Sequence, residues 1–254
     1  MRIFDSHIHA NFRNKEEFAA LSDRGYVAAV TCAFFPLIPR GPDTMLDLWD
    51  MILKRYTGNL RGVRIKAALG IHPRSIPKKD ASAALAELPD FLKRDDVVAI
   101  GEVGLELGSD EERKILAAQL EIAAETKTPV ILHTPRENKM ALFKEEMKII
   151  DSVGIAPELI IVDHNDENTL HEALERGHYA GLTISKGKLD PERAAGLIKE
   201  ELHYNDKILL NSDLGYSSKD IFSLADCVVE LARSVEPRVL EKLAYSNAAE
   251  LFGF

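Results

Sequence analysis

The chain has 254 residues, 46% of them hydrophobic, which is enough for one α/β barrel or for two smaller domains. Its formal net charge of −9 argues against a non-specific coat on nucleic acid and against an anionic membrane surface, although it does not exclude a nuclease whose bound metals offset the charge locally. No apolar run approaches the roughly 18 residues of a membrane span, and the charged N-terminus lacks the apolar core of a signal peptide, so we expect a cytoplasmic protein.

Eight short apolar runs alternate with longer helical patterns along the chain. They cover residues 2–6, 26–34, 63–70, 97–101, 129–133, 159–163, 179–183 and 207–211. Runs such as Leu159-Ile160-Ile161-Val162 are apolar throughout, which is typical of parallel strands buried on both faces. Because strands and helices alternate about eight times, the sequence predicts a parallel barrel or a doubly wound sheet.

Three polar clusters are typical of helix starts. Ser109-Asp110-Glu111-Glu112 and Thr134-Pro135-Arg136-Glu137 fit the capping box, and Asp190-Pro191-Glu192 combines an aspartate cap with proline at the first helical position. The stretch 36–42, with three prolines, is expected to be a long loop after the second strand. Because no linker, repeat or low-complexity block divides the sequence, residues 1–254 are predicted to form a single domain.

The first predicted strand leads directly into His7-Ile8-His9. Because strand side chains alternate in direction, His7 and His9 point to the same side, about 6–7 Å apart, and can converge on one metal ion. Asp5 lies on the same face and is expected to hold an imidazole nitrogen from behind. An isolated His-x-His motif is as often an exposed polar patch as a metal site, so the interpretation depends on further ligands.

Further potential ligands follow the later strands at a regular interval. Glu102, His133 and His164 each stand at the end of an apolar run and are spaced by 31 residues in both cases, which is the length of one βα unit. Asp213 follows another apolar run 49 residues after His164. These are the positions where a barrel carries its catalytic residues, at the C-terminal ends of the strands. The set therefore favours a (β/α)8 TIM barrel with a parallel eight-stranded sheet.

The number and type of donors predict a pair of metal ions. Four imidazoles and two carboxylates exceed the needs of one tetrahedral ion and fit two divalent ions bridged by a carboxylate and a hydroxide. Zn²⁺, Mn²⁺, Fe²⁺ or Co²⁺ suits these donors better than Ca²⁺, and Mg²⁺ is also compatible. Such a pair makes a nucleophile from the bridging water and polarises a carbonyl or phosphoryl oxygen, which predicts a metal-dependent hydrolase.

Taken in order, the motifs of the chain resemble the TatD-like branch of the amidohydrolase superfamily. They are Asp5-Ser6-His7-Ile8-His9, Gly70-Ile71-His72-Pro73, Gly101-Glu102-Val103-Gly104-Leu105, His133, His164, Gly181-Leu182-Thr183, Ser212-Asp213 and Ser246-Asn247-Ala248-Ala249-Glu250-Leu251-Phe252-Gly253. The resemblance runs from residue 5 to residue 253 and so covers the whole chain. The motifs are weak singly and specific in combination.

The resemblance implies two divalent metal ions and a set of roles for the residues around them. The first ion would be bound by His7, His9 and Asp213 and the second by His133 and His164, with Glu102 bridging the two. Asp213 would also be the general base that orients or deprotonates the bridging water. His72 would contact the phosphate of the substrate, although a histidine at this position also suits a cap of the turn before Pro73.

Three departures from the family pattern bear on the substrate. Asn211 stands where many TatD-like nucleases have an acidic residue, Asn165-Asp166-Glu167 replaces a small residue and an aromatic, and Pro135 takes the place of an arginine. Arg136 and Lys186 remain candidate contacts for a phosphate or carboxylate, or else are solvated surface charges. The metal ligands therefore match the family better than the residues that would hold nucleic acid.

Three functions remain open at this point. The first is two-metal hydrolysis of a phosphoester, with nucleic acid as a substrate only and with the possibility of a deoxyribonuclease. The second is hydrolysis of an amide or lactone by the same ions, and the third is a non-catalytic barrel that binds metal or a partner. A polymerase-and-histidinol-phosphatase-type barrel also begins with His-x-His but needs another His-containing pair near the C-terminus, where this chain has Ser212-Asp213. The natural substrate, the metal and the oligomeric state are left undetermined.

Overall fold

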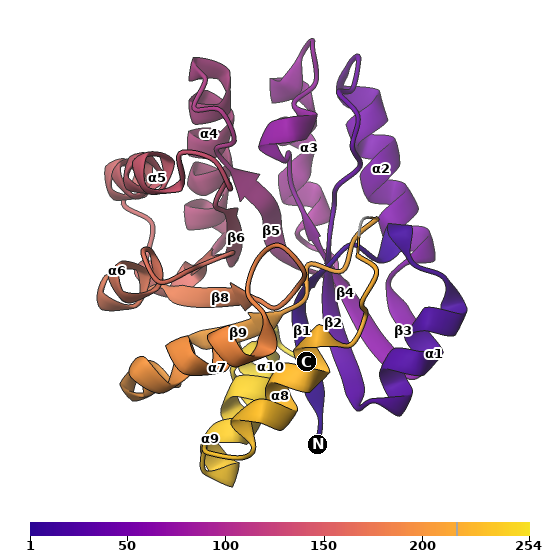
Figure 1. The fold of residues 1–254 in the computed structure, drawn as a ribbon. Helices are drawn as coiled ribbons and strands as arrows, with labels where there is room; N and C mark the ends of the chain where they lie inside the picture. The colour runs from indigo at the N-terminus through magenta and orange to yellow at the C-terminus, as the bar shows by residue number, and fades with distance from the viewer. Residues whose placement is uncertain (217) are drawn as a thin grey trace.

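The computed structural model describes residues 1–216 and 218–254. Eight parallel strands follow one another around a barrel in the order β1-β2-β4-β5-β6-β7-β8-β9, and β3 pairs antiparallel with β4 (Figure 1). The strands are β1 (Ile3–Ile8), β2 (Tyr26–Cys32), β3 (Gly58–Leu60), β4 (Val63–Leu69), β5 (Val97–Gly104), β6 (Val130–His133), β7 (Ile160–Val162), β8 (Tyr179–Thr183) and β9 (Ile208–Asn211). All eight predicted strands are confirmed, and only the short polar strand β3 was not predicted.

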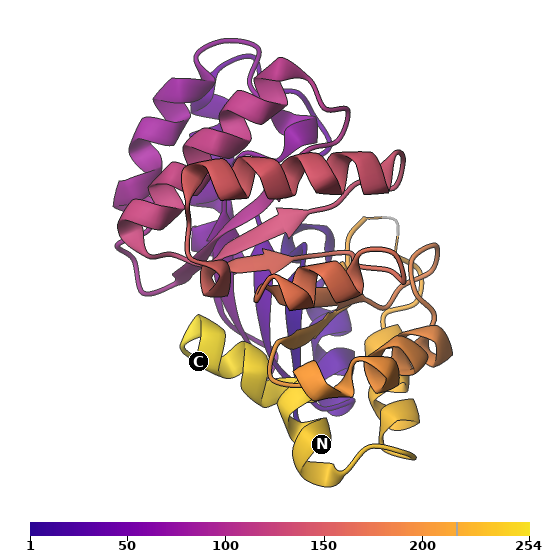
Figure 2. The ribbon, with the colours of Figure 1, turned by 90° about the vertical axis from the view of Figure 1, so that its left-hand side faces the viewer.

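Helices connect the strands and cover the outside of the barrel (Figures 1 and 2). They are α1 (Lys15–Asp23), α2 (Pro42–Arg55), α3 (Ala81–Phe91), α4 (Asp110–Thr126), α5 (Lys139–Val153), α6 (Leu170–Glu175), α7 (Pro191–Glu200), α8 (Ser223–Leu231), α9 (Pro237–Glu241) and α10 (Asn247–Phe252). Short 3-10 turns at Ala10–Phe12, Pro73–Ser75, Pro157–Leu159 and Leu202–Tyr204 and a π-helix at Lys242–Ser246 complete the described elements. None of the helices in the described part of the chain has the length and apolar composition of a membrane span.

Hydrogen bonds between the first and last strands bring the two ends of the sheet together. The backbone N–H of Asp213 donates to the carbonyl of His7 at 3.0 Å, and the N–H of His9 donates to the carbonyl of Leu214 at 3.0 Å. The barrel is therefore nearly closed, which confirms the (β/α)8 TIM barrel. The same bonds place the His-x-His segment beside the segment that carries Asp213.

Two of the three predicted helix starts are correct. The Ser109 hydroxyl accepts from the N–H of Glu112, and the Asp190 carboxylate accepts from the N–H of Arg193. The start predicted at Thr134 is wrong, because α5 begins at Lys139. Thr134 is buried at the end of β6, and its hydroxyl donates to the Asp163 carbonyl at 2.7 Å, so it joins two strand ends instead of capping a helix.

The inside of the barrel is filled by small and medium-sized side chains and closed at one end by the C-terminal helix. Phe4 and Ala28 point inward with one or more residues from β4, β5, β6, β7 and β9, and Phe252 of α10 packs against them. The rings of Phe4 and Phe252 stack with their centroids 6.0 Å apart. In Figures 1 and 2, α10 lies near the N-terminus, at the end where the strands begin. The opposite end is therefore the one available to a substrate.

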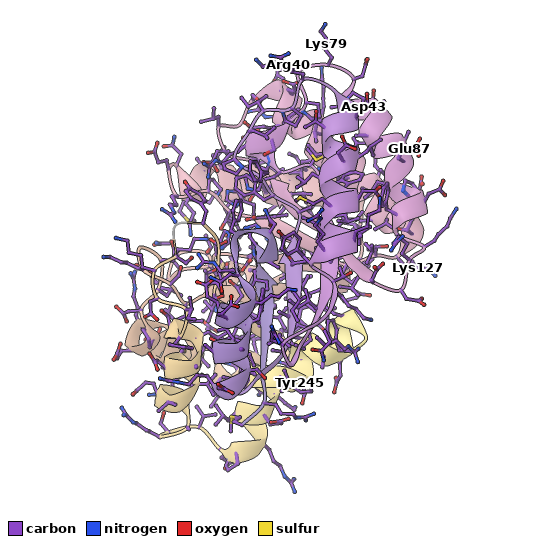
Figure 3. All side chains as sticks on the ribbon, turned by 90° about the vertical axis from the view of Figure 1, so that its right-hand side faces the viewer. Arg40, Asp43, Lys79, Glu87, Lys127 and Tyr245 are labelled. Atoms are coloured by element: carbon purple, nitrogen blue, oxygen red, sulfur yellow. The ribbon has the colours of Figure 1, made fainter. Side chains whose placement is uncertain are left out.

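Long loops extend the open end of the barrel on one side. The loop after β2 contains the proline-rich stretch, as predicted, and ends where α2 begins at Pro42. It is joined to the loop after the 3-10 turn Pro73–Ser75 by a hydrogen bond from the N–H of Lys78 to the carbonyl of Pro39. Figure 3 shows Arg40 and Lys79 of these loops together at one end of the molecule and Tyr245 at the other. These loops follow β2 and β4, and the second of them comes after His72.

Candidate metal centre

The C-terminal ends of the strands bring all six predicted ligands together. Five of them are buried and Asp213 is partly buried. They come from β1, β5, β6 and the segments that follow β1, β7 and β9, and they are His7, His9, Glu102, His133, His164 and Asp213. The 31-residue spacing therefore reflects neighbouring strand ends, since β5, β6 and β7 are adjacent in the sheet.

Glu102 lies at the centre of this group. Its Oε1 is 2.7 Å from His133 Nδ1 and 2.9 Å from His164 Nε2. Its Oε2 is 3.4 Å from His7 Nε2 and 3.7 Å from His9 Nε2. Oε2 is also 3.6 Å from His72 Nε2. The two carboxylate oxygens thus face two different sets of imidazoles, which is the arrangement that a bridging carboxylate requires.

The His-x-His pair and Asp213 form a compact donor group. The Nε2 atoms of His7 and His9 are 3.3 Å apart, and Asp213 Oδ1 is 3.2 Å from His9 Nε2 and 3.9 Å from His7 Nε2. Two further groups have donor atoms within 4.8 Å of one another. One joins His7, Glu102 and His164, and the other joins His72, Glu102 and His133. His72, expected as a substrate contact or as a cap of the turn before Pro73, therefore also lies within reach of a metal ion.

The residue that holds His7 from behind is Asp163, and the expectation for Asp5 is wrong. Asp163 Oδ2 lies 2.5 Å from His7 Nδ1. The Asp5 carboxylate instead accepts from the N–H and the hydroxyl of Ser212, at 3.0 and 2.5 Å, and so ties β1 to the end of β9. Gly181 leaves room for Asp163, because an added Cβ would collide with its Oδ1. The position of Asp163 directly before His164 was the signal that could have identified it.

The other imidazoles are also held at the nitrogen that does not face the centre. His9 Nδ1 lies 3.0 Å from the carbonyl of Cys32, and His164 Nδ1 lies 2.7 Å from the Thr183 hydroxyl. His133 contacts Glu106 through Nε2 at 2.9 Å. Such contacts fix the ring orientation of a metal-binding histidine and the nitrogen that it presents to the metal.

The electrostatics of the group depend on burial and on the mutual charges. Burial would raise the pKa of Glu102, but the neighbouring charges of His7 and His133 hold it well below its usual range. Burial lowers the pKa of His133, whereas Glu102 and Glu106 raise it, with a net value of about 9. Burial and the positive charge of Lys188 lower the pKa of His164 to about 4. Glu102 is therefore an anion and His164 a neutral imidazole near pH 7, as metal binding requires, whereas His133 carries a proton that a bound metal ion would displace.

The donor set fits divalent metal ions. A fully buried carboxylate such as Glu102, which is 3% exposed, is unfavourable unless cations lie close to it. Its neighbours are imidazoles, the donors preferred by zinc and by other late divalent transition metals. The nitrogen atoms that face it come from five different histidines, so the group supplies more donors than one tetrahedral ion needs.

A cavity of about 450 Å³ opens above the centre. One side is formed by Phe12, Phe34 and Tyr216, from the segments after β1, β2 and β9, which we call the aromatic wall. The rings of Phe12 and Tyr216 lie with centroids 5.7 Å apart, and Tyr216 is 63% exposed. His72 lines the same cavity.

His72 caps the turn after β4, as one of the two interpretations expected, and also faces Glu102. Its Nδ1 accepts from the N–H of Arg74 at 3.0 Å, which caps the turn after β4, and its Nε2 lies 3.6 Å from Glu102 Oε2. Arg136 is exposed on the loop after β6 and lines the cavity. Lys186 is exposed and lines neither described cavity at the centre, whereas Lys188, two residues later, lines both. Sequence reasoning missed Lys188 because nothing in the loop pattern shows which lysine points inward.

Two of the three departures from the family pattern have structural roles. Asn211 is buried and donates to Asp163 Oδ1 at 2.7 Å, so it positions the carboxylate that holds His7. Asn165 is buried and donates to the carbonyl of Val162 at 2.7 Å. These side chains support the metal centre, and their difference from the family pattern does not by itself remove a contact to nucleic acid.

A (β/α)8 barrel with buried imidazoles and carboxylates at the C-terminal ends of its strands belongs to the class of metal-dependent hydrolases. More particularly, the chain belongs to the TatD related DNase family, whose model matches residues 4–253. The chain is therefore a TatD-family metal-dependent hydrolase. The interpretation as a non-catalytic barrel is set aside.

Individual relatives resemble the chain to different extents. An uncharacterized metal-dependent hydrolase of Methanocaldococcus jannaschii is 37% identical over 225 residues, which cover 87% of this chain and 88% of that protein. The crystal structure of the TatD-like protein from Archaeoglobus fulgidus has a TM-score of 0.84 and 32% identity and covers 99% of this chain and 100% of that one. The 3'-5' ssDNA/RNA exonuclease TatD of Citrobacter koseri is 31% identical over 159 residues, which cover 58% of this chain and 56% of that protein.

Proposed function

We propose that residues 1–254 act as one domain that hydrolyses a phosphoester with two divalent ions. The observation that carries this proposal is the position of Glu102, whose two oxygens face two different sets of imidazoles. The first ion would be held by His7, His9 and Asp213 and the second by His133 and His164, with Glu102 bound to both. Zinc or manganese suits these donors, and magnesium is compatible with them.

Asp213 is placed to accept the proton of the attacking water. Bound divalent ions would supply a water of lowered pKa as the nucleophile and would polarise the phosphoryl oxygen. The two oxygens of Asp213 have different partners, because Oδ1 lies 3.2 Å from His9 Nε2 and Oδ2 accepts from Lys188 Nζ at 2.7 Å. We infer that Asp213 is the general base, with one oxygen directed at the centre and the other oriented by Lys188.

His72 and Arg136 are proposed to bind the substrate phosphate. Burial lowers the pKa of His72 well below its usual range, so its ring is neutral at pH 7. Because Nδ1 accepts from the N–H of Arg74, the ring proton is on Nε2, which faces the cavity and can donate to a phosphoryl oxygen. Arg136 lies at the mouth of the cavity, where its guanidinium can bind a phosphate through two parallel hydrogen bonds.

Nucleic acid is the phosphoester that we favour. The family is described as TatD related DNase, and the Citrobacter koseri relative is named a 3'-5' ssDNA/RNA exonuclease. The net charge of −9 is compatible with this substrate, because four basic side chains line a cavity beside the site and bound metal ions would offset the local negative charge.

The test is a substrate panel on the metal-loaded chain, with a single-stranded oligonucleotide, a simple phosphodiester, a lactone and a cyclic amide. We expect cleavage of the phosphodiesters, loss of this cleavage in His7→Ala, and about two metal ions per chain by elemental analysis. Hydrolysis of the lactone or the amide by a chain inert on phosphodiesters would replace the proposal by an amide or lactone hydrolase. A chain without bound metal after loading would contradict both.

A further inference from the structure

A second cavity of about 250 Å³ adjoins the metal centre on the side opposite the aromatic wall. It lies among the segments that follow β6, β7 and β8, whereas the aromatic wall follows β1, β2 and β9. Four basic side chains line it, and Asp166 is the acidic residue among its lining side chains. We call it the cationic cavity, and its basic residues are Arg136, Lys139, Lys188 and Arg193.

The two lysines, Lys139 and Lys188, lie deepest in the cationic cavity and are held there by hydrogen bonds. The side chains of Lys139 and Lys188 are 18% and 11% exposed. Lys188 Nζ contacts His164 Nδ1 at 2.8 Å and Asp213 Oδ2 at 2.7 Å, so the cavity begins within one hydrogen bond of two proposed metal ligands. Lys139 Nζ donates to the carbonyl of His164 at 2.6 Å and lies 3.2 Å from Asp166 Oδ2.

The contacts of the two lysines leave hydrogen-bonding capacity for a ligand. An ammonium group has three N–H donors, and the partners within residues 1–216 and 218–254 account for two donors on Lys139 and two on Lys188. Partly buried ammonium groups are stabilised by a nearby anion, and charge-assisted hydrogen bonds are the strongest type that they form. The remaining basic groups, Arg136 and Arg193, add positive charge at the rim.

We propose that the cationic cavity binds a second anionic group of the substrate, next to the group that reacts at Glu102. The substrate is then a molecule with two phosphates joined by a short linker, as in a nucleotide chain with a phosphate beyond the bond that is cut. This specificity rests on the proposed function for the identity of the reacting group. The binding of the second anion rests only on the charges and geometry of the cationic cavity.

The test compares the binding of adenosine 3',5'-bisphosphate with that of adenosine 3'-monophosphate and adenosine 5'-monophosphate to the metal-loaded chain by calorimetry. We expect the bisphosphate to bind about tenfold more tightly than the better monophosphate, because the second phosphate adds charge-assisted hydrogen bonds. In Lys139→Met this advantage is expected to fall to about twofold or less with little change for the monophosphates. Lys186→Met is the matched control, because Lys186 is exposed and does not line the cavity.

Several outcomes separate this inference from the proposed function. Equal binding of bisphosphate and monophosphates by the native chain would overturn the inference, as would an equal loss in Lys139→Met and Lys186→Met. Should Lys139→Met fail to fold, Arg193→Gln supplies the same comparison from α7, where Arg193 is about half exposed and pairs with Glu167. Tighter binding of the bisphosphate by a chain that cleaves no phosphodiester would support the cationic cavity as an anion site and refute the proposed reaction. Cleavage of phosphodiesters by a chain that binds bisphosphate and monophosphates equally would support the reaction and refute the anion site.

Discussion

The two sides of the barrel mouth differ in chemistry although they share one metal centre. The aromatic wall offers ring faces and little charge, whereas the cationic cavity offers ammonium and guanidinium groups within hydrogen-bonding distance of the centre. The strands beneath the two sides are alike, since both are parallel and apolar. The loops after the strands therefore determine which parts of a substrate lie on each side.

The difference suggests one orientation for the substrate. A ring such as a nucleobase would stack on the aromatic wall, and an anionic group would enter the cationic cavity, with the reacting phosphate between them above Glu102. Substitutions in the candidate metal centre should affect every substrate. Substitutions in the aromatic wall or in the cationic cavity should affect only substrates that carry the group bound there. The experiments below use this distinction.

The largest effect is expected from Glu102→Gln, which changes the candidate metal centre between the aromatic wall and the cationic cavity. The amide keeps the size of the side chain but removes the charge between the two sets of imidazoles. Because bound metal contributes several kcal/mol to such reactions, we expect activity on every cleaved substrate to fall about 10³-fold or more, together with the metal content. Glu137→Gln, an exposed carboxylate at the rim of the same cavity, is the control that should retain activity. Loss of activity with one class of substrate alone would argue against a shared centre.

A smaller effect is expected from Asp163→Asn, which alters the contact behind His7. Asp163 is 1% exposed and lies 2.5 Å from His7 Nδ1, and contacts of this kind change metal affinity by about 10- to 100-fold when removed. Metal titration of the purified variant measures the change. Asp5→Asn is the matched comparison, because Asp5 contacts Ser212 rather than the His7 ring, and its metal affinity should change less. An equal loss in the two variants would show that the position of Asp163 is unimportant.

The clustering of the six candidate metal ligands was largely predictable from the sequence, whereas the two sides of the mouth were not. Glu102, His133 and His164 end neighbouring strands, and the βα repeat gives them a regular spacing that a reader of the sequence can detect. Loops have no such period, so nothing in the sequence shows that Lys188 points inward and Lys186 outward. Chain distance also misled the assignment for Asp5, because its partner Ser212 is 207 residues away and becomes a neighbour only when the barrel closes.

The aromatic wall is tested by Phe12→Ala, which should act on ring-bearing substrates only. Stacking of a base on an aromatic side chain contributes about 1–3 kcal/mol, so we expect KM for a dinucleotide to rise about tenfold and KM for its abasic counterpart to stay nearly constant. Phe35→Ala is the control, because Phe35 stacks on Phe12 with centroids 5.6 Å apart but does not line the main cavity. Equal changes in KM for the two substrates in Phe12→Ala would show that the base of the substrate does not stack on the aromatic wall.

The smallest effect on activity is expected from Glu146→Gln, because Glu146 does not line the cationic cavity. Glu146 is fully buried on α5, the helix that begins at Lys139, and its Oε1 accepts from the N–H of Leu105 at 2.8 Å. Burial raises the pKa of this carboxyl from 4.5 to about 8. Its contribution to folding is therefore complete below about pH 4.5, where it is protonated in both states, and is lost as the pH rises towards 8.

Glutamine cannot ionise, so the Glu146→Gln variant avoids this loss. We expect its free energy of unfolding to equal that of the native chain near pH 5 and to exceed it by roughly 2–4 kcal/mol near pH 8. Chemical denaturation at the two pH values measures the difference. Glu145→Gln, which breaks a partly exposed pair with Arg113, should show no such rise with pH. A Glu146→Gln advantage that is the same at both pH values would mean that Glu146 is already ionised in the folded barrel.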